Sequence, residues 1–217
     1  MNTCRLYYSP GSCSLAAHVV LEETGAPYVL DAVPVAEGAT QSPRYLAINP
    51  KGRVPALELP GEPRVLTELP AIVTLIARRH RAVLDMLPAD PLDEARCNEW
   101  FAWLTGWVHG VGFGGLWRPA RFIAAPALHA AVSAHARGTI EASYATIEQR
   151  LADGREYAVP CGYTVVDPFL LVLYRWGVRI GLPMRDTCPA WSALTSRLLE
   201  RPAVQRVLRD EGIEFAV

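Results

Sequence analysis

One cysteine in this chain is placed where a thiol can be reactive. Cys13 follows a turn cluster, Ser9-Pro10-Gly11-Ser12, and opens an apolar run with helical spacing. The start of a helix has unsatisfied backbone N–H groups and the positive end of the helix dipole, which stabilise negative charge. We therefore expect a thiolate at Cys13, with a pKa below that of an ordinary thiol. The alternative is that Cys13 is a small buried apolar side chain, as most free cysteines are.

Two other side chains have the chemistry to act beside a thiol. His109 lies in an apolar segment, and Glu68 follows a short apolar run. An imidazole exchanges protons near neutral pH, and a carboxylate holds an ammonium group through a charge-assisted hydrogen bond. Each also has a purely structural interpretation. A lone histidine in an apolar helix is commonly a packing residue, and the helix dipole favours a carboxylate at a helix start.

The composition excludes several classes of partner. Lysine and arginine total 21 against 22 aspartate and glutamate, so the chain lacks the broad basic surface that nucleic-acid binding requires. The five cysteines are widely spaced and form no CxxC pair, which predicts reduced thiols and no metal site. No apolar run is long enough to span a membrane, and the first residues do not have the pattern of an export signal. We expect a cytoplasmic protein without nucleic-acid or membrane partners.

The elements that must position these side chains fall into two groups. The first 80 residues predict the order β-α-β-α-β-β-α, with Gly25 ending the first helix and Thr67 capping the last. The strands are expected at 4–8, 28–33, 54–59 and 64–66, and the helices at 13–24, 42–48 and 67–80.

Beyond residue 91 the strand signals almost disappear and helical spacing dominates. Helices are expected at 92–111, 125–152, 166–180, 190–201 and 203–210, with a Thr164-x-x-Asp167 capping box before the third. The segment between the two groups has mixed charge and two prolines. We predict an α/β domain over residues 1–81, a linker over 82–90 and an all-helical domain over 91–217.

The first domain resembles the thioredoxin-like fold, in which a cis proline, here Pro55, lies beside the substrate thiol. The segments 7–18, 49–57 and 67–68 are more closely similar to bacterial glutathione transferases of the beta class. Segments 107–110, 116–119, 163–169 and 201–205 match that family in the same order, so the resemblance covers nearly the whole chain.

The resemblance implies a site for reduced glutathione as co-substrate. In the family the equivalent of Cys13 contacts the glutathione sulfur, the backbone of Val54 pairs with the cysteinyl part, Glu68 meets the γ-glutamyl ammonium, and His109 faces the cysteine across a cleft. The resemblance also implies a two-fold homodimer. The residues implied for glutathione are Ser12, Cys13, Arg53, Val54, Pro55, Glu68, Leu69 and His109, with Cys13 and His109 as the catalytic pair.

Three polar contacts of the family are missing from this sequence. Leu69 stands where a hydroxyl side chain helps to bind the γ-glutamyl carboxylate, Ala102 stands where an asparagine is common, and a lysine after the second strand is absent. If each contact contributes about 0.5–1.5 kcal/mol, losing three weakens binding by roughly one to three orders of magnitude.

Three functions follow from these features. The first is transfer of the glutathione thiolate to a small apolar electrophile, with Trp107, Phe113 and Trp117 forming its pocket; these aromatic residues can equally pack the helical core. The second is glutaredoxin-like thiol-disulfide exchange through Cys13. The third is a binding protein that keeps the fold without catalysis.

Overall fold

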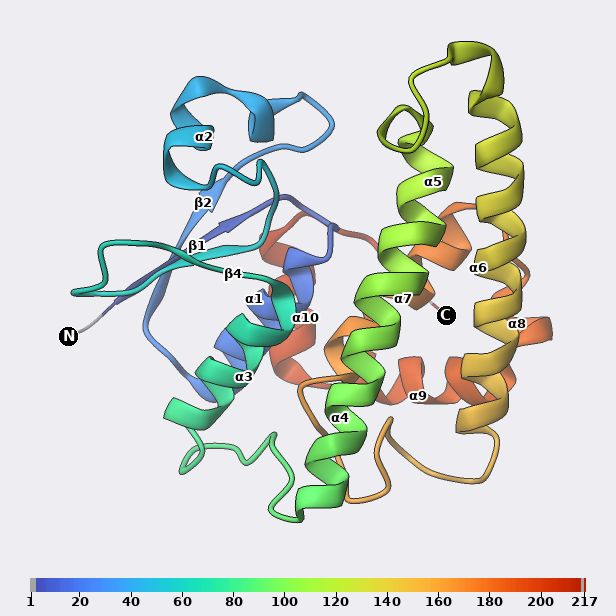
Figure 1. Ribbon diagram of the computed structural model, residues 1–217. Coiled ribbons are helices and arrows are strands. Elements are labelled where there is room, and N and C mark those ends of the chain that lie inside the picture. The colour runs from blue at the N-terminus through green and yellow to red at the C-terminus, as the bar shows by residue number, and fades with distance from the viewer. Residues whose placement is uncertain (1–2, 216) are drawn as a thin grey trace.

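A four-stranded mixed sheet forms the first part of the molecule (Figure 1). The computed structural model describes residues 3–215 and 217. The strands are β1 (Cys4–Tyr8), β2 (Tyr28–Ala32), β3 (Ala56–Glu58) and β4 (Leu66–Thr67), in the spatial order β2-β1-β3-β4. β1 and β2 pair in parallel, whereas β3 pairs antiparallel to β1 and to β4. This topology confirms the predicted thioredoxin-like fold, with strand ends within two residues of those expected.

Three helices accompany the sheet: α1 (Ser14–Thr24), α2 (Pro43–Ile48) and α3 (Leu69–Arg79). α1 and α3 pack against each other, and Gly25 ends α1 in the left-handed conformation, as predicted. The prediction that Thr67 caps α3 was wrong. Thr67 pairs with Ala56 in the sheet, so the cap falls on the next residue, Glu68.

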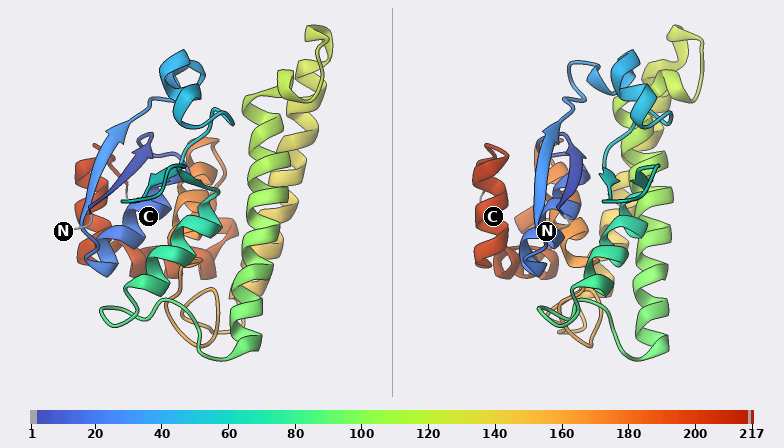
Figure 2. Two further views of the ribbon diagram at one scale, coloured as in Figure 1. Left: turned by 60° about the vertical axis from the view of Figure 1, so that its left-hand side comes forward. Right: turned by 90° about the vertical axis from the view of Figure 1, so that its left-hand side faces the viewer.

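The second part is helical. Its predicted first helix is longer than expected, because α4 (Pro91–Trp103) continues through η2 (Leu104–Phe113), a stretch with π-helical hydrogen bonding, into α5 (Gly114–Trp117). A π-helical stretch of this length is unusual, and such departures are frequent at functional sites. Figure 2 shows this continuous rod standing beside the long helix α6 (His129–Leu151). The short 3₁₀ turns are η1 (Ala39–Gln41), η3 (Pro119–Arg121) and η4 (Pro126–Leu128).

The remaining helices are α7 (Asp167–Arg179), α8 (Met184–Thr187), α9 (Pro189–Leu199) and α10 (Pro202–Asp210). α7 is the centre of the core and is buried almost throughout. At its start the Asp167 carboxylate accepts the Thr164 N–H at 2.7 Å, and also the Ala158 N–H at 2.7 Å. The predicted capping pair therefore also fastens the loop before α7. No helix in the described part of the chain is long and apolar enough to cross a membrane.

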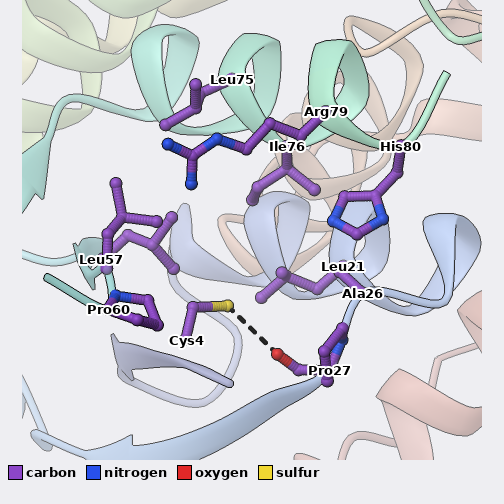
Figure 3. A pocket seen from close by; sticks show the side chains of 11 residues that line it. Cys4, Leu21, Ala26, Pro27, Leu57, Pro60, Leu75, Ile76, Arg79 and His80 are labelled. Carbon is purple, nitrogen blue, oxygen red and sulfur yellow. Dashed lines mark hydrogen bonds between the residues drawn. The ribbon is translucent and has the colours of Figure 1, made fainter. Parts of the chain in front are cut away.

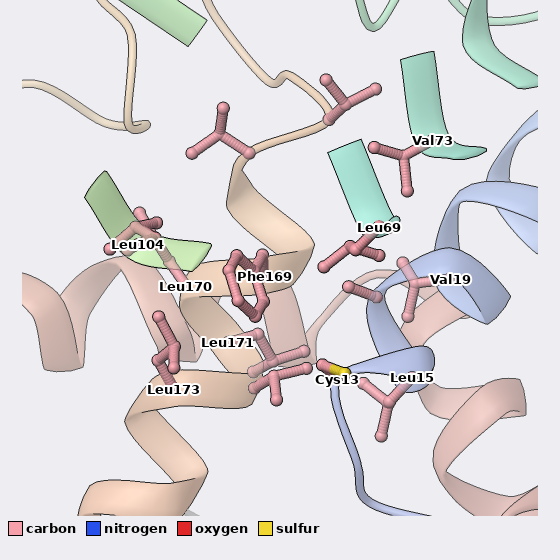
Figure 4. Close-up of a cluster of buried hydrophobic side chains, with 14 of the residues drawn as sticks. Cys13, Leu15, Val19, Leu69, Val73, Leu104, Phe169, Leu170, Leu171 and Leu173 are labelled. Carbon is pink, nitrogen blue, oxygen red and sulfur yellow. The ribbon is translucent and has the colours of Figure 1, made fainter. Parts of the chain in front are cut away.

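The two parts share one apolar core (Figure 4). Leu15 and Val19 of α1 and Leu69 of α3 face Phe169 and Leu171 of α7 across it. Cys13 lies at this junction, with its side chain among those of both parts. Because α1 also packs against α10, the helix that begins at the cysteine is held by helices from the far end of the chain.

Candidate functional site

A cavity of about 260 Å³ lies between the sheet-bearing part and the π-helical stretch. It brings together segments that are far apart in the sequence: the start of α1, the loop before β3, the β4–α3 junction, η2 and η3. Its lining residues are Cys13, Asn49, Lys51, Arg53, Val54, Pro55, Thr67, Glu68, Leu69, Thr105, His109, Gly110, Gly114, Arg121 and Phe122. Seven of the eight residues implied for glutathione are among them.

Cys13 is the residue before α1 and is 8% exposed. Its thiol donates a hydrogen bond to the carbonyl oxygen of Val54 at 3.3 Å, and the Val54–Pro55 peptide bond is cis. Burial raises the pKa of this thiol to about 12, although backbone N–H groups and the charge of Arg53 act in the opposite direction. The expected low-pKa thiolate is therefore contradicted. Desolvation by the apolar core outweighs the helix terminus.

The turn before Cys13 is held from both sides by the helical part. The carbonyl oxygen of Gly11 accepts the indole N–H of Trp176 at 2.9 Å and a guanidinium N–H of Arg175 at 3.3 Å. The N–H of Gly11 donates to the carboxylate of Glu211 at 2.8 Å. Sequence reasoning missed all three residues, because none of them lies within 160 positions of the turn.

Ser12 is the one implied glutathione residue that does not line the cavity. Its hydroxyl is 2.7 Å from the hydroxyl of Ser14, and its oxygen accepts the Ser14 backbone N–H at 3.2 Å. These contacts give Ser12 a local role in starting α1.

Glu68 is held at the cavity edge by its backbone and by a cation. Among the residues that the structure describes, it is the one non-glycine residue with a positive φ, of 72°. Such conformations cost about 1–3 kcal/mol and concentrate at functional sites. Its carboxylate lies 2.6 Å from the ammonium of Lys51, which also donates to the Thr67 hydroxyl at 2.9 Å. Lys51 lies in the segment 49–57 that resembles the family, but it is not among the residues that the resemblance implies for glutathione.

His109 lies on the opposite wall, in the π-helical stretch. Its ring centroid is 5.0 Å from that of Trp176 and 6.2 Å from that of Phe169. Burial, together with the charges of nearby arginines, lowers the pKa of His109 to about 4. The imidazole is therefore neutral at pH 7, able to donate or accept a hydrogen bond without carrying a charge.

The three aromatic residues predicted for an electrophile pocket do not line this cavity. Phe113 is buried, with its ring 4.7 Å from that of Trp117 and 4.9 Å from that of Trp176. Trp107 is half exposed. The cavity wall beside His109 is instead formed by Gly110, Gly114 and Phe122, together with Thr105 and Arg121.

A second cavity, of about 500 Å³, lies at the far end of α1 (Figure 3). The thiol of Cys4 points into it and donates to the Pro27 carbonyl oxygen at 3.5 Å. None of the residues implied for glutathione lines it, so it is separate from the candidate site. Its lining residues are Cys4, Leu21, Ala26, Pro27, Leu57, Leu59, Pro60, Leu75, Ile76, Arg79 and His80.

Comparison with known proteins gives relatives along the whole chain. Residues 11–79 match the family model "Glutathione S-transferase, N-terminal domain". The glutathione S-transferase GstA of Escherichia coli O157:H7 is 30% identical, with 97% of this chain and all of that protein covered. The glutathione S-transferase GST-4.5 of Xanthomonas campestris is 31% identical, with 96% of this chain and 99% of that protein covered.

Solved structures with the same overall fold include two that hold glutathione. A glutathione transferase homologue from Sulfitobacter, with bound glutathione, has a TM-score of 0.90 at 28% identity over 99% of this chain and all of that chain. A sphingomonad glutathione S-transferase complexed with glutathione has a TM-score of 0.82 at 33% identity over 97% of this chain and all of that chain. A bacterial beta-class glutathione S-transferase from Sphingomonas chungbukensis has a TM-score of 0.83 at 29% identity, with the same coverage.

Proposed function

Because this chain belongs to the glutathione S-transferase family, we propose that its site binds reduced glutathione in the cavity between Cys13 and His109. The chain is a glutathione transferase, an enzyme that joins the sulfur of glutathione to an electrophile. The observation that carries the proposed location is the convergence of Cys13, the cis Val54–Pro55 peptide, Glu68 and His109 on one cavity. They come from four separate segments of the chain.

The cavity offers glutathione backbone hydrogen-bonding groups and one carboxylate. Val54 lies just before β3 and lines the cavity, so its backbone N–H and C=O groups can pair with an extended peptide ligand. Glu68 is the cavity's carboxylate for the γ-glutamyl ammonium, which would take the place that Lys51 occupies at 2.6 Å. Leu69 supplies no side-chain hydrogen bond, but its N–H lies in the first turn of α3, where backbone donors have no partner within the helix.

The reacting sulfur belongs to glutathione in this mechanism. Cys13 is protonated at neutral pH, so its S–H can turn from the Val54 carbonyl and donate to the glutathione sulfur. The neutral imidazole of His109 can donate from the opposite wall, and Arg53 adds positive charge. Glutathione releases its thiol proton to solvent. Its sulfur then forms a bond to the electrophilic carbon, and the leaving group departs with the electron pair of the broken bond.

The same observations weigh against Cys13 as the principal nucleophile. Thiol-disulfide exchange requires a thiolate, and the buried Cys13 thiol has a raised pKa. The two chemistries separate in Cys13→Ser. If conjugation survives in this variant, glutathione is the nucleophile. If the variant loses both conjugation and disulfide reduction, exchange through Cys13 is supported.

Calorimetric titration of reduced glutathione into the wild-type protein tests the site. We expect a dissociation constant between micromolar and low millimolar. Glu68→Gln should weaken binding by roughly 10-fold to 100-fold, because a hydrogen bond to a charged group contributes about 1.5–3 kcal/mol. The matched control is Glu62→Gln, in the exposed β3–β4 loop, which should bind as wild type does. Folded wild-type protein that shows no binding would refute the proposed site.

We also propose that the enzyme is a two-fold homodimer, as the family resemblance implies, and that it works in the cytoplasm. Light scattering at micromolar concentration measures the first part, and a monomeric mass would count against it. Fractionation of the cells that make the protein, followed by immunodetection, measures the second.

A further inference from the structure

The cation beside Glu68 at the edge of the cavity is the only lysine of the chain. One of the 21 lysine and arginine residues is a lysine, and it is Lys51. Arginine forms a rigid two-point contact with a carboxylate, whereas lysine brings a single compact charge on a flexible stem. Lys51 can therefore leave one carboxylate for another close by without losing a two-point contact.

The backbone that carries Lys51 is fixed from inside the protein. Asn49 is 2% exposed; its side-chain oxygen accepts the N–H of Lys51 at 3.1 Å, and its amide donates to the carbonyl oxygen of Arg53 at 2.7 Å. The next residue, Gly52, has a φ of +60°, and a Cβ there would meet the Nε2 atom of Gln41 at 2.5 Å. The turn therefore holds the backbone of Lys51 at the cavity, whereas its side chain is 52% exposed and can move.

The ammonium of Lys51 is held by contacts that a ligand can replace. It lies 2.6 Å from the Glu68 carboxylate and donates to the Thr67 hydroxyl at 2.9 Å. The side chain of Glu68 is 66% exposed. An ion pair as exposed as this one stabilises a protein little, because water screens it. The ammonium of a ligand can therefore take the place of Lys51 at Glu68 at little cost.

The γ-glutamyl end of glutathione brings an anion to the same place. It has the structure of an α-amino acid, with an ammonium and a carboxylate on one carbon, and the ammonium nitrogen is about 2.5 Å from the carboxyl carbon. With the ammonium at Glu68, this carboxylate lies within reach of the Lys51 side chain. Leu69 offers it no side-chain donor, so a charge-assisted contact has to come from a cation of the cavity. Lys51 is the cation in contact with Glu68.

We propose that Lys51 binds the α-carboxylate of the γ-glutamyl group, after the ammonium of that group has displaced it from Glu68. Glu68 and Lys51 together then hold both charges of the γ-glutamyl end, each with a partner of opposite sign. Lys51 thereby supplies the contact that a hydroxyl side chain would make at position 69. This inference rests on the proposed function and adds a residue to the same site.

Three peptide ligands test the proposal. The first is reduced glutathione. The second, 4-aminobutyryl-cysteinyl-glycine, lacks only the α-carboxylate of the γ-glutamyl group. The third, γ-glutamyl-cysteinyl-glycinamide, keeps that carboxylate and lacks the charge of the glycine carboxylate. Because the second and third ligands have the same net charge, a difference between them identifies the carboxylate that Lys51 contacts.

Dissociation constants are measured for the wild-type protein and for Lys51→Gln by calorimetry, and by ligand-detected NMR for a ligand too weak for calorimetry. We expect Lys51→Gln to weaken binding of glutathione and of the glycinamide peptide by about tenfold, the loss expected for a hydrogen bond to a charged group. Binding of the aminobutyryl peptide should stay within about twofold of the wild-type value. The matched control is Arg64→Gln, which removes a positive charge from the exposed β3–β4 loop and should leave all three constants unchanged.

The other outcomes overturn the inference. Equal weakening of all three ligands would mean that Lys51 acts through the charge or the structure of the cavity as a whole. Binding that is unchanged or tighter for all three would mean that Lys51 only competes with the ligand for Glu68. Weakening of the aminobutyryl peptide with the glycinamide peptide unaffected would assign Lys51 to the glycine carboxylate. A folded wild-type protein that binds no glutathione overturns the proposed site itself, and the inference with it.

Discussion

Replacing Gly11 by alanine should damage the site more than the fold. Gly11 has a φ of +66°, and its N–H and C=O are both held by the helical part, two residues before Cys13. A Cβ at Gly11 would meet the Nη1 atom of Arg175 at 2.6 Å. Arg175 can move its guanidinium, but it then loses its hydrogen bond to the Gly11 carbonyl oxygen.

The expected loss of stability has two components. A non-glycine residue in the left-handed conformation costs about 1–2 kcal/mol, and the lost hydrogen bond costs about 0.5–1.5 kcal/mol. A change of 1 kcal/mol lowers Tm by about 2–4 °C in a protein of this length, so Gly11→Ala should lower Tm by about 3–14 °C. The conjugation rate should fall by more than this loss of stability explains. A displacement of about 1 Å in a reacting group can cost on the order of 100-fold in rate.

Gly25→Ala is the matched control. Gly25 has nearly the same φ, of +62°, but a Cβ there meets nothing within 4 Å, and it lies at the far end of α1 from Cys13. It should lose about 1–2 kcal/mol of stability, or about 2–8 °C in Tm, and keep its conjugation rate within about twofold. Thermal unfolding and initial conjugation rates are measured on both variants. If Gly11→Ala retains as much activity as Gly25→Ala, the contacts to Gly11 do not position the cysteine.

Three other measurements follow from the charges and burial. Iodoacetamide at pH 8 should label the exposed Cys161 before the buried Cys13, and peptide mapping that finds the reverse order would contradict the raised pKa of Cys13. His109 binds a proton near pH 4 in the folded protein and near pH 6.5 in the unfolded chain, so its contribution to stability is lost as pH falls from 6.5 to 4. His109→Gln should therefore flatten the dependence of the unfolding free energy on pH across that window. Asp167→Asn should leave at least one buried N–H unpaired and lower stability by about 1–3 kcal/mol in urea unfolding, whereas the exposed Asp186→Asn should be neutral.

The fold was predictable from local signals, because strand alternation, Gly25 and the Thr164–Asp167 pair each act within a few residues. The errors arose where tertiary contacts decide the outcome. Threonine is a common helix-capping residue, but Thr67 pairs with Ala56 in the sheet and is therefore part of β4. The π-helical hydrogen bonding of η2 has no sequence pattern that distinguishes it from an α-helix, so the apolar run predicted only a helix over 92–111.

The sequence predicted which residues meet at the site better than it predicted their protonation states. Cys13, Val54, Glu68 and His109 follow from the family motifs, and the cavity brings them together. The protonation state of Cys13 depends on desolvation by side chains of α3 and α7, which a helix-terminus argument does not include. Lys51 was missed although it lies in the matching segment 49–57, because its role depends on the contact with Glu68 from another segment. Arg121 was missed because it lies outside every segment that resembles the family.

The site is a product of both parts of the chain, although the residues that contact glutathione in the proposed mechanism come mainly from the first part. The N–H and C=O of Gly11 are satisfied by residues of α7 and by Glu211 just after α10, more than 160 positions away. A fragment ending near the predicted linker would leave these polar groups without their partners and would expose the apolar face of α1 that α7 and α10 cover. The change from strands to helices near residue 82 therefore separates two types of secondary structure without separating two independent cores. The position of Cys13 therefore depends on the C-terminal helices as well as on the turn between β1 and α1.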